Sequence, residues 1–367
     1  MKRRSSFQQR SLQKCNTTTF FALLLCLCIA SLLLLEFNSR SINLLLPIFR
    51  NPFPSNPKIA FLFIARNRLP LDFYWDAFFR ADKDKKFTIY VHSRPGFLLN
   101  KATTKSLYFL DRQVNDSIQV DWGEATMILA ERVLLKNALV DPLNERFVFL
   151  SDSCIPLYNF SYTYDYIMST SRSFVDSFAD KKDGRYNPKM HPIIPVSNWR
   201  KGSQWVVLNR KHAEVIVKDE TVFPVFQQHC RRKSLPEFWR DQPFPVDPSK
   251  EHNCIPDEHY VQSLLAQEGL EDEITRRSLT HTAWDLPSTR DRERRGWHPV
   301  SYKFSDATPQ LIQSIKEIDN INYETEYRRE WCSSKGKPAP CFLFARKFTR
   351  PAALRLLNTT MLCLECN

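Results

Sequence analysis

Asp152 is the first residue whose type and position could support chemistry. It follows Phe147 to Ser151, a run that predicts a buried β-strand, and Pro156 comes shortly after it. Ligands bind at strand ends in open α/β sheets, so this carboxylate could contact a metal, contact a sugar, or have no ligand. The next residues are Ser153 and Cys154, so no second acid completes an Asp-x-Asp pair with Asp152. One carboxylate cannot hold a catalytic metal by itself, so we expect Asp152 to form hydrogen bonds instead.

Glu258 is the second candidate, because it opens a predicted helix. Asp257 is a suitable N-cap, and apolar residues at helical spacing predict a helix over 257–269. A glutamate in the first turn often only complements the helix dipole. The alternative is a general base within reach of a substrate hydroxyl. His252 and His259 flank it, but two histidines seven residues apart without a third ligand do not predict zinc.

Arg346 and Lys347 form a basic pair within CFLFARKFTR. Such a pair near a C-terminus is commonly a solvated surface. Here Phe342, Phe344 and Phe348 surround it, which places the charges at the edge of a hydrophobic element. Arginine binds phosphate oxygens with a planar fork and lysine as a point charge. The pair would therefore suit a diphosphate leaving group.

Four tryptophans and one histidine complete the set of candidates. A tryptophan can be part of a core, or its face can stack on a sugar ring. We predict that Trp122, Trp199, Trp205 and Trp297 contact an acceptor, and that the loop 282–302 acts as a lid. His92 ends a predicted strand over 86–93, and we assign it to the same donor site as Asp152.

Alternating strands and helices must position these residues. The patterns predict strands at 58–65, 86–93, 146–151, 204–209 and 278–284, and helices at 69–82, 123–139, 158–168, 209–220, 257–269 and 308–319. Strand and helix alternate over the first 110 residues of this region, which predicts an α/β fold with a mostly parallel central sheet. The chain has only seven glycines, and no Gly-rich phosphate loop or dinucleotide fingerprint occurs.

The N-terminus carries a membrane-anchor pattern. Residues 1–16 contain five basic residues and no acid, and 17–35 contain no charge. Nineteen uncharged residues can span a bilayer, and the basic flank favours a cytoplasmic N-terminus. A cleaved signal peptide usually has a shorter apolar region and a small-residue cleavage site, and a buried core helix would not have this flank. We therefore predict a cytoplasmic tail (1–16), a signal anchor (17–35), a stem (36–57), one lumenal catalytic domain (58–358) and a C-terminal tail (359–367).

This topology restricts the partners of a chain whose formal charge is +12. A lumenal domain does not meet nucleic acid, and its disulfides are permitted. Seven cysteines follow the predicted anchor, so at least one is free or pairs between chains; Cys332 and Cys341 are the first choice for a bridge. Asn115, Asn159 and Asn358 are glycosylation sequons. A homodimer is left open.

Several motifs occur in an order that resembles one family. They are FLFIARNRLPLDFYWDAFF, FTIYVHSRPGF, VDWGEATMILAERVLLKNAL, FVFLSDSCIPLYNF, SNWRKGSQWVVLNRKHA, PDEHYVQSLL and LFARKF. Singly these motifs are weak, but together they are similar to the core-2/I-branching β-1,6-N-acetylglucosaminyltransferases (glycosyltransferase family 14), and most of all to the divergent plant branch. The resemblance covers about 58–358.

The resemblance implies a Golgi type II membrane enzyme with a GT-A-like fold. It would transfer a sugar from a UDP-sugar co-substrate to a glycan or glycoprotein, with inversion and without a metal or other cofactor. By this resemblance Glu258 is the base, and Arg346 and Lys347 hold the diphosphate. The animal enzymes have a further arginine, for which the candidates here are Arg329, Lys335 and Lys337.

Two other functions remain open from the sequence. The first is a lumenal carbohydrate-binding protein on the same fold that has lost activity, although Glu258 and the basic pair are both retained. The second is a metal hydrolase, which the histidine spacing does not favour.

Overall fold

The computed structural model describes residues 56–181, 185–232, 254–284 and 299–360. The predicted tail and anchor, nearly all of the stem, Trp297 and the last seven residues lie outside this range, so those predictions stay untested. Within the described ranges, no helix combines the length and the apolar character needed to cross a membrane.

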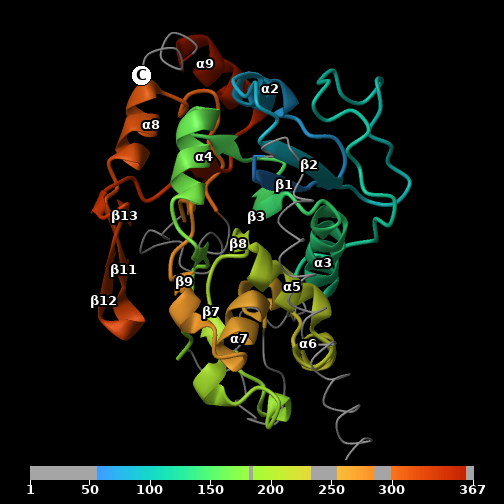
Figure 1. Cartoon of the computed structure of the whole chain (residues 1–367), viewed down its shortest axis with the longest axis vertical. Coiled ribbons are helices and arrows are strands. Elements are labelled where there is room, and N and C mark those ends of the chain that lie inside the picture. The colour runs from blue at the N-terminus through green and yellow to red at the C-terminus, as the bar shows by residue number, and fades with distance from the viewer. Residues whose placement is uncertain (1–55, 182–184, 233–253, 285–298, 361–367) are drawn as a thin grey trace, which may run out of the picture. The chain divides into compact units, whose positions relative to one another are not determined.

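A six-stranded sheet forms the centre of the described fold (Figure 1). Its strands follow the order β2-β1-β3-β8-β5-β9. They are β1 (Lys58–Ile64), β2 (Phe87–His92), β3 (Asn144–Ser151), β5 (Ser173–Phe174), β8 (Val207–Asn209) and β9 (Ile274–Thr275). β1 pairs in parallel with β2 and β3, and only β8 runs against its neighbours. The predicted mostly parallel sheet is confirmed.

Helices cover both faces of this sheet because β1 is apolar on both sides. Ile59, Phe61 and Phe63 belong to one buried cluster, and Ala60 and Leu62 to another. Figure 1 shows α2 and α9 above β1 to β3, with α3 and α5 below. The helices are α2 (Asp72–Arg80), α3 (Thr126–Leu139), α4 (Phe160–Met168), α5 (Arg210–Lys218), α6 (Val222–His229), α7 (Tyr260–Gln267), α8 (Pro309–Lys316) and α9 (Arg350–Thr360). Continuous apolar strands with two covered faces are typical of parallel sheets.

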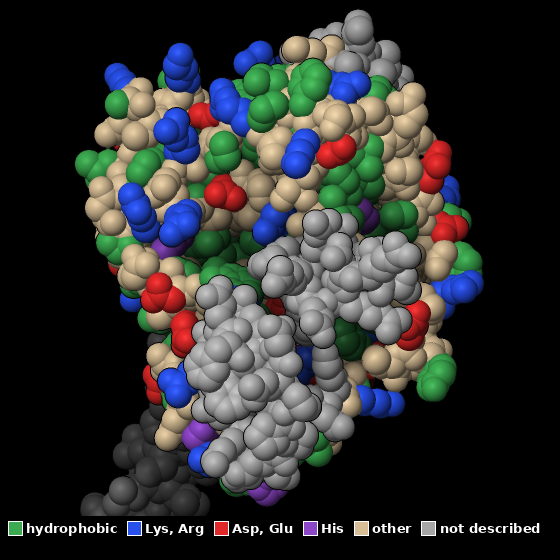
Figure 2. Space-filling model, turned by 180° about the vertical axis from the view of Figure 1, so that it is seen from behind, with side chains coloured by type: hydrophobic (Ala, Val, Ile, Leu, Met, Phe, Trp, Pro, Cys, Tyr) green, Lys and Arg blue, Asp and Glu red, His purple; other side chains and the backbone are tan. Residues whose placement is uncertain are grey.

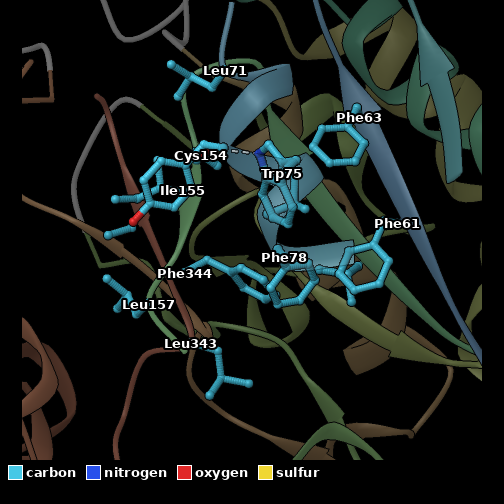
Figure 3. Packing of buried hydrophobic residues seen from close by; sticks show 14 of the residues in the cluster. Phe61, Phe63, Leu71, Trp75, Phe78, Cys154, Ile155, Leu157, Leu343 and Phe344 are labelled. Atoms are coloured by element: carbon cyan, nitrogen blue, oxygen red, sulfur yellow. Dashed lines mark hydrogen bonds between the residues drawn. The ribbon is translucent and has the colours of Figure 1, made fainter. Parts of the chain in front are cut away.

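An aromatic cluster beside α2 fixes the turn after β3. Trp75 packs edge-on against Phe61 and Phe63, with ring centroids 6.1 and 5.0 Å apart, and lies 6.1 Å from Phe344 (Figure 3). Its indole Nε1 donates a hydrogen bond of 3.1 Å to the Cys154 carbonyl. The buried Trp75 ring therefore positions Cys154, which follows the turn at Asp152, and Phe344, which lies in the same strand as Arg346.

Smaller sheets complete the description. β10 (Thr280–Thr282), β15 (Phe344–Arg346) and β4 (Ile155–Pro156) form one sheet, with β15 parallel to β10 and antiparallel to β4. Three two-stranded pairs also occur: β6 (Phe178–Ala179) with β7 (Arg200–Lys201), β11 (Asn320–Tyr323) with β12 (Arg328–Trp331), and β13 (Ser333–Ser334) with β14 (Lys337–Pro338). The central β15 brings the C-terminal part of the chain beside the end of β3.

One predicted helix begins later than expected. Residues Pro256–Glu258 form a 3-10 turn, η4, and α7 starts at Tyr260 with His259 as its N-cap. Asp257 is buried in the turn and does not cap the helix, so the N-cap prediction for it is wrong. The physical reason is that Pro256 favours a tight first turn, whose 3-10 geometry ends before the α-helix begins.

The cysteines are partly as predicted. Cys332–Cys341 is a disulfide, which confirms the first-choice pair, and Cys154 is free and buried. A second disulfide, Cys230–Cys254, was not expected. The last two cysteines lie outside the described residues. On the face seen in Figure 2, lysines and arginines are scattered among hydrophobic and acidic side chains.

Candidate active site

A cavity of about 1200 Å³ lies where the three parallel strands β1, β2 and β3 end. Ile64, His92 and Ser151, their last residues, all line it. Ligand sites usually measure about 300–1000 Å³, so this cavity has room for two reacting molecules. Glu258, Asp152, Arg346 and Lys347 also line it. The structure therefore brings the four main predicted residues together.

Asp152, Arg346 and Lys347 form one wall, which we call the cation wall. β15 pairs with β4, and the Phe348 amide donates a 2.9 Å hydrogen bond to the Ser153 carbonyl. The two basic residues are thereby held against the turn that carries Asp152. Burial raises the pKa of Asp152, while the two cations oppose that rise. Two positive charges face one negative charge, so this wall suits an anion.

Desolvation and repulsion act on the two cations. Burial lowers the pKa of Arg346, and burial together with Arg346 lowers the pKa of Lys347. The Arg346 guanidinium lies over the Trp205 ring, 4.5 Å from its centroid, and its Nε is buried without a hydrogen-bond partner. The negative charge of a bound anion would offset the cost of burying the two cations and the repulsion between them.

Glu258 lines the same cavity, and we call Glu258, Lys201 and Asp257 the base wall. The Lys201 ammonium forms an ion pair with Glu258 Oε2. The Glu258 side chain is 27% exposed, and among the described residues its other oxygen has no protein partner. An acceptor hydroxyl can therefore reach a carboxylate whose charge is already stabilised.

Backbone contacts fix this pair. The Gly202 amide donates a 2.9 Å hydrogen bond to the Glu258 carbonyl, and the carbonyl of Arg200 lies 2.7 Å from His259 Nδ1. A Cβ at Gly202 would lie 1.7 Å from the Asp176 carbonyl oxygen. Only glycine permits this approach, so the Lys-Gly step lets β7 dock on the turn that carries Glu258.

Other buried carboxyls adjoin the base. Asp257 is 4% exposed, and burial together with the charge of Glu258 raises its pKa to about 7. Burial also raises the pKa of Glu131 and of Asp176. Asp176 accepts hydrogen bonds from Tyr323 Oη and from the Ser203 amide. The base wall therefore contains a buried carboxyl, Asp257, beside the partly exposed Glu258.

His92 lines the cavity but is held by the protein. It is 1% exposed, and its Nε2 accepts a 3.1 Å hydrogen bond from the Ile118 amide. Burial lowers its pKa, so the ring is neutral at pH 7. In the structure His92 therefore anchors the loop before Trp122, and any donor contact must be made by its other nitrogen or its ring edge.

The predicted tryptophans have different surroundings. Trp122 is 53% exposed and lines the cavity, as the acceptor role requires. Trp205 also lines it but is only 6% exposed and supports Arg346. Trp199 is 1% exposed and stacks on His259 with centroids 4.3 Å apart. The acceptor role predicted for Trp199 is wrong, because packing against α7 buries its ring.

The three candidates for a further basic contact do not line this cavity. The described lining of the cavity includes none of Arg329, Lys335 and Lys337. Arg66 and Arg94 line it instead, both at exposed positions after β1 and β2. The sequence signal for these two was their place directly after predicted strands, which is the signal that identified Asp152.

Lys201 and Asp176 are the other residues that sequence reasoning missed. Lys201 is 57 positions from Glu258, and no spacing rule connects the two. Among the predicted sequons, Asn115 and Asn358 are exposed, and Asn159 is half-buried and caps α4 through its side chain. Within the described residues, no three or more His, Cys, Asp or Glu side chains are arranged to hold a metal ion.

Comparisons with known proteins identify the family of the chain. The model of the Core-2/I-Branching enzyme family matches residues 59–316. The chain is also 73% identical over 311 residues to "Glycosyltransferase BC10" of Oryza sativa subsp. japonica, which covers 84% of this chain and 78% of the rice protein. The match to the family model includes Asp152, Lys201 and Glu258 and ends before Arg346. The chain thus belongs to the core-2/I-branching family of glycosyltransferases, as a plant-type member.

Proposed function

We propose that the protein transfers a sugar of the N-acetylglucosamine type, or a related one, from a UDP-sugar to a glycan or glycoprotein. The observation that carries the proposal is the opposite charge of two walls of one cavity. The base wall presents Glu258, and the cation wall presents Arg346 and Lys347. A single displacement needs a base at the acceptor and positive charge at the leaving group.

The reaction follows from this arrangement. An acceptor hydroxyl donates its proton to Glu258 as its oxygen attacks the anomeric carbon. The bond between that carbon and the diphosphate oxygen breaks, and the electron pair leaves with UDP. Attack opposite to the leaving group inverts the anomeric configuration. Arg346 and Lys347 are positioned in advance to stabilise the departing charge, so this step needs little reorganisation.

Two side chains would orient the donor and the acceptor. Asp152 lines the cavity beside the two cations, where its carboxylate can accept hydrogen bonds from sugar or ribose hydroxyls. Trp122 presents an exposed ring at the same cavity, suited to the apolar face of an acceptor sugar. We propose that the base wall and Trp122 bind the acceptor, and that the cation wall and Asp152 bind the donor.

The proposal includes metal independence and a place in the cell. Two fixed cations can replace the charge that a metal would supply to a diphosphate. The basic tail and apolar segment before residue 36 support a Golgi type II membrane protein with a lumenal catalytic domain.

A donor screen tests the proposal. The purified full-length protein is assayed with a panel of UDP-sugars and glycan acceptors, with and without excess EDTA. We expect transfer from one UDP-sugar, inverted linkage, and at least half of the activity in EDTA. UDP binding without transfer or donor hydrolysis would instead indicate an inactive carbohydrate-binding protein. Complete loss in EDTA would overturn the role of the cation wall.

A further inference from the structure

Arg277 is a buried cation without a carboxylate partner. It is 1% exposed, and no ion pair within the described residues includes it. Its Nη1 donates to the Cys341 carbonyl and its Nη2 to the Tyr166 hydroxyl, each at 2.7 Å. Its Nε is buried without a partner. A buried charge is normally paired, because removing it from water is costly.

This guanidinium lines a second cavity, of about 310 Å³, which we call the rear cavity. Arg172 and Lys335 line it as well, so three cations surround it. The one carboxylate in its described lining is that of Glu330, which is paired with Arg328 at 2.8 Å. The remaining charge of the described lining is therefore positive.

Hydroxyl groups and an aromatic ring give the rear cavity further chemistry. Five serine and threonine hydroxyls line it, those of Ser169, Thr170, Thr275, Ser333 and Ser334. Trp331 lies in the same lining and is 60% exposed. Hydroxyl groups suit a polyhydroxylated ligand, and an exposed indole offers a platform for a sugar ring.

The rear cavity is separate from the catalytic cavity, but the same segments of the chain contribute residues to both linings. In the segment from the end of β9 to the start of β10, Thr275 and Arg277 line the rear cavity, and Ser278 and Thr280 line the catalytic one. The hairpin of β11 and β12 is divided in the same way, with residues of β11 on the catalytic side and Trp331 of β12 on the rear side. No described residue lines both.

We propose that the rear cavity binds an oxyanion carried on a saccharide, such as the carboxylate of a uronic acid or a sugar sulfate. The guanidinium of Arg277 and the ammonium of Lys335 bind the oxyanion, and Trp331 contacts the sugar ring. The proposal does not depend on the donor or on catalysis, since the catalytic residues lie in the other cavity.

Calorimetry on the full-length protein tests the proposal with glucuronate, inorganic sulfate and glucose as probes. We expect glucuronate to bind more tightly than sulfate, and glucose not to bind. Lys335→Gln should weaken glucuronate binding about tenfold, the effect of one charge-assisted hydrogen bond. Lys337→Gln is the matched control, because Lys337 is an exposed lysine of the same hairpin that does not line the cavity. The Lys337→Gln variant should bind glucuronate with the same affinity as the unchanged protein.

A second variant and a competition experiment separate the sources of binding. Trp331→Ala should reduce glucuronate affinity to that of sulfate and leave sulfate unchanged. Equal affinities for sulfate and glucuronate in the unchanged protein would overturn the saccharide part of the proposal. Displacement of glucuronate by saturating UDP would place it in the catalytic cavity and overturn the proposal. Undetectable anion binding, or equal effects of the two lysine variants, would also overturn it.

Discussion

The base wall and the cation wall are built from the same kinds of residue in opposite proportions. On the base wall, Lys201 is paired with Glu258 and adjoins the buried Asp257. On the cation wall, Asp152 adjoins both Arg346 and Lys347. On the base wall one cation pairs with one carboxylate, and on the cation wall one carboxylate adjoins two cations. One wall is therefore prepared to accept a proton, and another to accept a departing anion.

The two walls also differ in how the backbone builds them. The base wall depends on β7 docking against η4 through Gly202, whose backbone lies against Asp176, two residues after β5. The cation wall depends on β15 pairing with β4, beside the aromatic cluster around Trp75. Substitutions in the two walls should therefore have distinguishable effects on proton transfer and on donor binding.

The largest effect should follow from Glu258→Gln. The amide is similar in shape but cannot accept the proton, so we expect transfer to fall about 10³-fold, within the range for a general base. The measurement is kcat in a sugar-transfer assay. Glu268→Gln, at the exposed end of α7, is the control and should keep full activity. A variant at Glu258 with normal kcat would contradict the base assignment.

Lys347→Met should have the next largest effect. Loss of one preorganised cation at the leaving group should lower kcat/KM about 100-fold. Lys347→Arg keeps the charge and should lose less. Lys101→Met, at an exposed surface position, is the control. If Lys347→Met retained normal kcat/KM, the cation wall would have no part in the reaction.

Lys201→Met removes the cation that pairs with Glu258 on the base wall. Without its cationic partner Glu258 is less well oriented, so we expect kcat to fall about tenfold with little change in KM for the donor. Lys201→Arg keeps the charge and should restore most of the activity. Lys189→Met changes an exposed lysine and serves as control. If Lys201→Met kept a normal kcat, Lys201 would be only a structural contact.

Asp257→Asn should have the smallest effect on activity and a defined effect on stability. An aspartate ionises near pH 3.8 when unfolded, whereas the folded protein keeps Asp257 protonated up to about pH 7. The native state binds more protons in this window, so this group makes the free energy of unfolding fall as pH rises from about 4 to 7. The asparagine variant should lack this slope in denaturant titrations at several pH values, and Asp272→Asn, at an exposed position, should retain it.

The sequence predicted the part of the fold that depends on local pattern. The continuous apolar run of β1, the helical spacing of apolar residues in α3 and the alternation of strands and helices were visible because burial selects the residues along each element. Asp152, Glu258, Arg346 and Lys347 were found because each stands at the end of such an element, and the structure places all four at one cavity.

What the sequence did not show depends on contacts between distant segments. Lys201 meets Glu258 only after β7 docks on η4, and Trp199 is buried only because α7 packs against it. Aspartate is a residue type that often caps helices, but the 3-10 turn buries Asp257 instead. Cys230–Cys254 joins residues 24 positions apart across a segment without a periodic pattern. Pairing of this kind cannot be derived from one sequence.

Calorimetric titration of UDP into Glu258→Gln and Lys347→Met tests the division between the two walls most directly. The account predicts that Glu258→Gln binds UDP within about twofold of the unchanged protein, while Lys347→Met binds it at least about tenfold more weakly, the loss expected for one charge-assisted contact to phosphate. The account would be contradicted if Glu258→Gln lost UDP binding, or if Lys347→Met bound UDP with unchanged affinity.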